Sequence, residues 1–133
     1  MSAFVTDTHP LLYFAGSEER RLGRKARTAF RAFEAGEIAL YVPATVVLET
    51  WLLARGGRLR LGSTLARWWQ DIEGPGLVHV ELTANDVLAA SELEWDHKDV
   101  FDRLIVASAR RLDLPLITGD AAITDWAGVP IHW

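Results

Sequence analysis

The chain has 133 residues, half of them hydrophobic and 24% charged, which is typical of one soluble globular domain spanning residues 1–133. It contains no cysteine, which excludes disulfides, zinc–thiolate sites and thiol nucleophiles, and its net charge of −4 argues against holding nucleic acid by bulk attraction alone. No apolar run approaches the roughly 18 residues of a membrane span and no signal peptide is evident, so we expect a cytoplasmic protein without membrane contact.

Strands and helices are expected to alternate along the chain. In order, the expected elements are strand 3–6, helix 9–15, helix 18–35 capped by Ser17, strand 38–42, helix 43–54, helix 64–73, strand 77–82, helix 84–93, helix 100–112, strand 116–118, helix 120–126 and strand 129–132. Glycine and proline mark most boundaries, and Thr83 with Asp86 forms a capping box. This alternation predicts an α/β fold with a mostly parallel central sheet of about five strands flanked by helices.

Four acidic residues lie directly beside apolar segments. They are Asp7, Glu49, Asp102 and Asp120. Burying an unpaired carboxylate is costly, and a shared cation would remove that cost for all of them. Asp7 and Asp120 also follow expected strands, and in parallel sheets ligands bind outside the carboxyl ends of the strands.

Each acid also has a structural interpretation. Taken singly, helix capping explains Asp7, Asp99, Asp102 or Asp120 about as well as chemistry does, since side-chain carboxylates favour helix starts. Glu49 is the exception, because on a helix its neighbours three and four positions away are mainly apolar. An acid in that position requires a partner or a cation.

Together, three acids at helix starts or strand ends and one embedded acid indicate a single cluster. Carboxylates held a few ångström apart repel strongly unless a cation lies between them. Oxygen ligands select hard ions, so Mg²⁺ or Mn²⁺ is the expected cofactor. Such a cluster usually activates water for phosphodiester cleavage, which predicts hydrolysis of a nucleic-acid backbone.

Four segments carry a resemblance to a known family: residues 5–12, 43–49, 97–109 and 114–120. In order and spacing they resemble the motifs of the PIN-domain nucleases, and most closely the VapC-type toxins of bacterial toxin–antitoxin pairs. The third segment, HKDVFDRLIVASA, is the most specific match. Val100 stands where close relatives commonly have proline. This difference changes how the loop enters a helix but does not replace an expected metal ligand.

The resemblance implies a PIN-like fold and a metal-dependent endoribonuclease. It implies that Asp7 and Asp102 are the main metal ligands and that Glu49 and Asp120 assist them. The accessory candidates are Asp99, Thr118 and Arg103. It also implies a toxin that acts on RNA, forms a homodimer and is held inactive by a VapB-like antitoxin.

Other interpretations remain open at this point. The chain could be a catalytically silent PIN-fold module that binds RNA or protein, or a phosphatase with Asp7 as nucleophile, although the usual second acid of such a site is replaced by His9. The histidines show no metal-ligand spacing, so structural or surface roles are expected, although His9 and His97 lie near the acids in sequence and could contact substrate. Arg103 could bind phosphate, bind an acidic segment of a partner, or pair with the acids.

Overall fold

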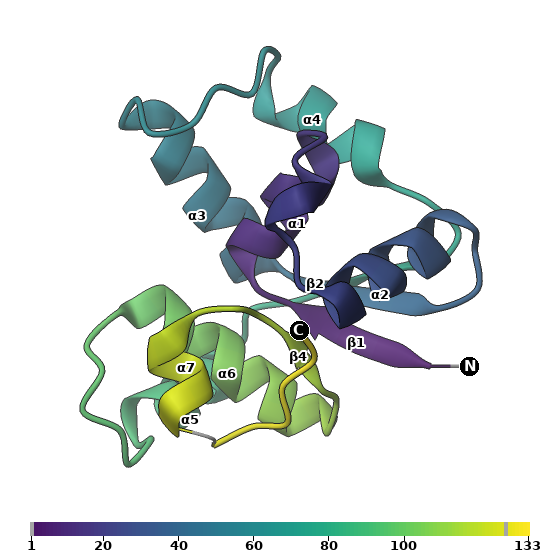
Figure 1. The fold of residues 1–133 in the computed structure, drawn as a ribbon. Helices are drawn as coiled ribbons and strands as arrows, with labels where there is room; N and C mark the ends of the chain where they lie inside the picture. Colours follow the sequence, from purple (N-terminus) through teal and green to yellow (C-terminus); the bar gives the residue numbers. More distant parts are fainter. Residues whose placement is uncertain (1, 127) are drawn as a thin grey trace.

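A parallel sheet forms the centre of the computed structural model, which describes residues 2–126 and 128–133 (Figure 1). Within these residues the sheet has four strands in the order β3-β2-β1-β4, and all neighbouring strands are parallel. The strands are β1 (Ala3–Thr6), β2 (Ala39–Pro43), β3 (Leu77–Val80) and β4 (Leu116–Ile117). The expected α/β class is confirmed.

The last expected strand, residues 129–132, is reduced to a single parallel bridge between Leu116 and Ile131. The Leu116 N–H donates to the carbonyl of Pro130, and the His132 N–H donates back to Leu116. Pro130 has no N–H to extend the ladder, and β4 itself is only two residues long. The sheet therefore has four strands rather than about five.

Helices cover both faces of this sheet. They are α1 (Thr8–Ala15), the 3₁₀ helix η1 (Glu19–Arg21), α2 (Arg24–Glu34), α3 (Ala44–Arg55), α4 (Leu65–Ile72), α5 (Ala84–Ser91), α6 (Val100–Leu112) and α7 (Ala121–Trp126). Helices α1 to α4 lie on one side and α5 to α7 on the other (Figure 1). None of the helices in the described residues is long and apolar enough to cross a membrane.

The prediction of a helix over residues 18–35 is wrong for the first part of that range. Ser17 has a φ of 59°, which a helix start does not accept, and only a short 3₁₀ turn follows. The chain then becomes extended at Leu22, whose side chain is buried in the core, and α2 begins after Gly23. A Cβ on Gly23 would lie 2.6 Å from the carbonyl carbon of Trp133, so the close approach of the C-terminal segment requires glycine here.

The strand order creates a crevice between β1 and β4. From β1 the chain moves to β2 and then β3, whereas the connection from β3 to β4 returns in the opposite direction. Because such crossovers are right-handed, the helices after β1 and those around β4 cover opposite faces. The carboxyl ends of β1 and β4 therefore border the kind of gap in which α/β proteins bind ligands.

Candidate active site

Asp7 lies at the carboxyl end of β1 and is buried, with 5% of its surface exposed. Its Oδ1 accepts a hydrogen bond of 2.8 Å from the Thr8 N–H, which caps α1, and its Oδ2 accepts one of 2.7 Å from the Thr118 hydroxyl. Burial raises the pKa of Asp7, and the two hydrogen bonds oppose that rise. The expected cap is therefore also a buried acid facing β4.

Thr118 joins the carboxyl ends of the neighbouring strands β1 and β4. Its hydroxyl donates to Asp7 and accepts a hydrogen bond of 3.1 Å from the Asp120 N–H. Asp120 is exposed, and its Oδ1 accepts from the Ala122 N–H at 2.8 Å at the start of α7. Asp7 and Asp120 line the same cleft, and the charge of Asp120 adds to the rise in the pKa of Asp7.

Glu49 extends from α3 and is half-buried. The Thr8 hydroxyl donates a hydrogen bond to its Oε1. Burial raises the pKa of Glu49, and the nearby charges of Asp7 and Asp99 raise it further. The surrounding apolar run is not buried throughout, because Leu48, Trp51 and Leu52 are among the exposed large hydrophobic residues.

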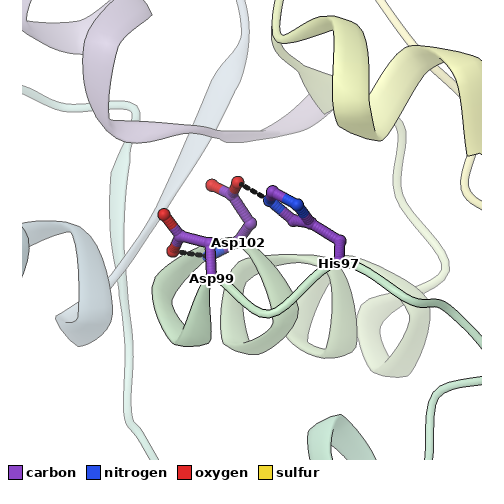
Figure 2. A group of neighbouring side chains, drawn as sticks. All are labelled: His97, Asp99 and Asp102. Atoms are coloured by element: carbon purple, nitrogen blue, oxygen red, sulfur yellow. Dashed lines mark hydrogen bonds and ion pairs between the residues drawn. The ribbon is translucent and has the colours of Figure 1, made fainter.

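Asp102 lies in the first turn of α6, between Asp99 and His97 (Figure 2). Asp99 is the N-cap, and its Oδ1 accepts a hydrogen bond of 3.1 Å from the Asp102 N–H. On the other side, His97 Nε2 is 2.6 Å from Asp102 Oδ2. Burial raises the pKa of Asp102 to about 7; the hydrogen bond from His97 lowers it, and the charges of Asp7, Asp99 and Asp120 raise it.

The negative charges of the five acids act on one another's pKa values. The charge of Asp120 contributes to the raised pKa of Asp7, and the charges of Asp7 and Asp99 contribute to that of Glu49. The raised pKa of Asp102 includes contributions from Asp7, Asp99 and Asp120. Such a group of oxygen donors fits a divalent cation, because a cation would offset the repulsion that raises these pKa values. His97, Asp99 and Asp102 offer ligand atoms that lie within 4.8 Å of one another.

His97 and Arg103 differ from their sequence-based interpretations. His97 contacts Asp102 directly, and the spacing of the histidines in the sequence does not predict this pairing. Arg103 donates to four backbone carbonyls instead of pairing with the acids, so its role as an accessory to substrate or acids is not seen. The residue spacing of five between His97 and Asp102 is the only sequence signal that points to their contact.

A cleft of about 520 Å³ opens beside the acids. It is lined by Asp7, His9, Pro10, Tyr13, Arg21, Thr118, Gly119, Asp120 and Trp133. The Arg21 guanidinium lies 4.2 Å from the centre of the Tyr13 ring. A second, apolar cleft of about 400 Å³ lies along α3, α4 and β3, and none of the five acids is in its lining. The polar cleft, which Asp7 and Asp120 line, is therefore the better candidate for a substrate site.

Solved structures with the same fold include several toxin proteins. VapBC2 from Rickettsia felis, bound to a promoter DNA fragment, superposes with a TM-score of 0.68 and 12% identity, covering 98% of this chain and 97% of that one. VapC20 from Mycobacterium tuberculosis, described as a sarcin–ricin loop cleaving toxin, superposes with a TM-score of 0.66 and 17% identity. The match covers 99% of this chain and 100% of that one. A toxin–antitoxin complex from Klebsiella pneumoniae superposes with a TM-score of 0.62 and 21% identity, covering 100% of this chain and 97% of that one.

A search of curated proteins finds no significant match. The family model for the PIN domain matches residues 4–129, which include all five acids. That match spans nearly the whole chain, and the chain belongs to the PIN-domain family.

Proposed function

We propose that the protein is a divalent-metal-dependent endoribonuclease of the VapC type. The observation that carries this proposal is the arrangement of acids around Asp7 at the carboxyl end of β1. Thr8 links Asp7 to Glu49, and Thr118 links Asp7 to Asp120. Asp102 lies beside Asp99, and the charges of Asp7, Asp99 and Asp120 contribute to its raised pKa. Membership of the PIN-domain family supports a nuclease, and the similarity to a sarcin–ricin loop cleaving toxin supports RNA as the substrate.

In this proposal Asp7 and Asp102 hold Mg²⁺ or Mn²⁺. The bound cation supplies a lowered pKa for a water ligand and offsets negative charge on the phosphate. Thr118 keeps the Asp7 carboxylate oriented through its hydrogen bond of 2.7 Å. Glu49, whose Oε1 accepts from Thr8, and Asp120, which is exposed at the cleft, orient the attacking water.

The cleft beside the acids provides a path for the RNA backbone. Asp7 and Asp120 form one part of its lining, and His9, Tyr13 and Arg21 form another. An arginine over an aromatic ring can bind phosphate and support base stacking at one place. We assign Arg21 and Tyr13 to substrate contact, because a chain of net charge −4 needs local positive charge to bind RNA.

Metal withdrawal and restoration test the proposal. The purified chain should cut single-stranded RNA in Mg²⁺ or Mn²⁺, stop in excess EDTA, and resume when either ion is restored. Asp102→Asn, purified in parallel, controls for a contaminating nuclease and should remain inactive. Cleavage that continues in EDTA, or equal cleavage by Asp102→Asn, would refute the metal-dependent mechanism.

The alternative is a PIN-fold module that binds RNA or protein without cutting. It lacks a specific observation in its favour, because none of the motif acids is missing from the crevice. In a filter-binding assay such a module would retain RNA, and in the cleavage assay it would produce no new RNA ends. That result in the presence of Mn²⁺ would favour the alternative.

We further propose a cognate VapB-like antitoxin as partner and a homodimer as the assembly. The toxin–antitoxin complexes with this fold support the first. Expression of the chain alone should arrest bacterial growth, and co-expression of the antitoxin should relieve the arrest. A homodimer should have twice the 14.8 kDa mass of the chain in light scattering, and a monomer mass would contradict it.

A further inference from the structure

We propose that His97 is a positioning residue for the metal-binding carboxylate of Asp102, and that Arg103 holds His97 in place. This inference rests on the proposed function, since it assigns Asp102 to the metal. It adds two residues whose roles come from the geometry of the loop between α5 and α6.

The contact between His97 and Asp102 is direct. Nε2 of His97 lies 2.6 Å from Oδ2 of Asp102, and the two side chains are 28% and 11% exposed. A carboxylate that binds a cation is ionised and only accepts hydrogen bonds, so Nε2 must carry the hydrogen. The hydrogen bond from His97 to Oδ2 then holds the Asp102 carboxylate in one orientation.

Arg103 fixes the loop from which His97 projects. Its Nη1 donates to the carbonyls of Trp95 at 2.7 Å and His97 at 3.0 Å, and Nη2 donates to Leu93 at 2.8 Å. Its Nε donates to Ala90 at the end of α5, at 3.0 Å. Each bond from a charged donor to a carbonyl is worth more than a neutral one. Arg103 therefore fixes the backbone at His97 relative to the helix that carries Asp102.

Aromatic packing restricts the imidazole ring as well. The Trp95 ring lies 4.7 Å from the His97 ring between centroids, and the Trp126 ring stacks on the Trp95 ring at 4.4 Å. Trp126 is itself tied to the loop, because its Nε1 donates to the Glu94 carbonyl at 3.1 Å. With the backbone held by Arg103 and the ring held by Trp95, Nε2 is directed at Asp102.

Two different roles would place a histidine here, and they have different consequences for metal choice. As a hydrogen-bond donor to a ligand, His97 affects all divalent cations alike, since it orients an oxygen that they share. As a direct ligand, its nitrogen would favour Mn²⁺ and later transition metals over Mg²⁺, which prefers oxygen. The hydrogen-bond distance of 2.6 Å to Oδ2 supports the first role.

Calorimetric titration with Mg²⁺ and with Mn²⁺ tests the assignment. His97→Ala should weaken the binding of both ions by a similar factor, about 10- to 100-fold. His97→Gln, whose side-chain amide can donate from nearly the same position, should restore most of the affinity. His79→Ala is the matched control, because it removes a histidine paired with Glu73 at 3.1 Å outside the acid cluster, and it should leave both affinities unchanged.

A double-mutant cycle tests the part of Arg103. Arg103→Lys should weaken metal binding in the same direction, because one ammonium group cannot reach all four carbonyls. If Arg103 acts through His97, the double variant Arg103→Lys/His97→Ala should bind Mn²⁺ no more weakly than His97→Ala alone. Additive losses would assign Arg103 to general stability and overturn this part of the proposal.

Three results would overturn the role of His97: unchanged Mn²⁺ affinity in His97→Ala, no recovery in His97→Gln, or a loss confined to Mn²⁺. The proposed function fails separately and recognisably. In that case wild-type protein would bind neither ion, or Asp102→Asn would bind Mn²⁺ as tightly as wild type.

Discussion

At the scale of single residues, Thr118 links two of the acids directly. Its hydroxyl donates to Asp7 and accepts from the Asp120 N–H, so one side chain links the ends of β1 and β4. Both Thr118 and Asp7 are buried and line the cleft, and the Thr118 hydroxyl is the hydrogen-bond donor to Asp7 Oδ2. The orientation of the Asp7 carboxylate therefore depends on Thr118.

Thr118→Val removes that hydroxyl and keeps the branched shape. It leaves a buried carboxylate with one hydrogen-bond donor fewer, and we expect a loss of about 1–3 kcal/mol in the free energy of unfolding. Urea denaturation measures this loss. Thr28→Val is a suitable control, because the Thr28 hydroxyl is exposed and bonds only within α2, and its change should be much smaller.

The raised pKa of Asp102 predicts how stability depends on pH. Burial moves the pKa from 3.8 to about 7, so the folded protein holds the proton more tightly than the unfolded chain. The resulting stabilisation is complete below the unfolded value and is lost as pH rises through about 7. Burial also raises the pKa values of Asp7 and Glu49, which act in the same direction.

Metal-free protein should accordingly melt at a lower temperature at about pH 8 than at about pH 5.5. Asp102→Asn removes one titrating group, so the difference between the two melting temperatures should shrink. Calorimetric scans at both pH values measure it. A variant with the same pH dependence as wild type would show that Asp102 does not titrate in this range.

The positions of the acids, but not their contacts, could be predicted from the sequence. Asp7 and Asp120 follow short apolar strands and Asp102 opens an apolar helix, and local patterns of this kind are visible in the chain itself. The pairing of His97 with Asp102 depends on a loop whose path is fixed by hydrogen bonds from Arg103. These contacts join residues five and six positions apart through a loop without regular structure, so no helix or strand periodicity indicates them.

At the scale of elements, an ion pair joins α5 to α6. Asp86 is 1% exposed, and its two carboxylate oxygens accept from Arg111 Nε at 2.6 Å and Nη2 at 3.2 Å. Asp86 also completes the capping box with Thr83 that the sequence predicts. The same side chain thus starts α5 and attaches it to α6, the helix that carries Asp102.

Asp86→Ala should lower the free energy of unfolding by about 1–3 kcal/mol, since it removes a helix cap and leaves a charged partner unpaired. Asp71→Ala breaks the exposed pair with Arg67 on α4 and should change it by less than about 1 kcal/mol. Urea denaturation of the two variants provides the comparison. Equal losses would contradict a structural role for the buried pair.

Element boundaries were predictable where local signals are strong. The expected helix 100–112 coincides with α6, because Asp99 caps its start and the apolar pattern continues to its end. The expected helix over residues 18–35 fails because Leu22 leaves the helical path to enter the core and Gly23 packs against Trp133. Tertiary contact overrides helix propensity at that point.

At the scale of the whole molecule, the proposed function assigns metal binding to the acidic crevice and RNA binding to the cleft beside it. Arg21 lines the cleft and lies over Tyr13, whereas the metal site lies with the acids. Arg21→Gln should therefore raise the KM for RNA about three- to tenfold with little change in kcat, as expected for loss of one charged contact.

Steady-state cleavage of a short RNA measures both constants. Arg67→Gln on α4 is the matched control, because Arg67 is exposed and lies outside the cleft lining, and it should leave KM unchanged. Equal effects of the two substitutions would indicate bulk attraction in place of a specific contact. A fall in kcat alone would move Arg21 from substrate binding to the chemical step.

The most direct test of the account is RNA cleavage by purified Asp7→Asn in Mg²⁺. Asparagine keeps the shape and removes the charge, so it should reduce cleavage by at least about a hundredfold. The melting temperature of the metal-free variant should equal or exceed that of wild type, because a buried charge has been removed. Cleavage by folded Asp7→Asn at the wild-type rate would contradict the assignment of the acidic crevice as a metal-dependent ribonuclease site.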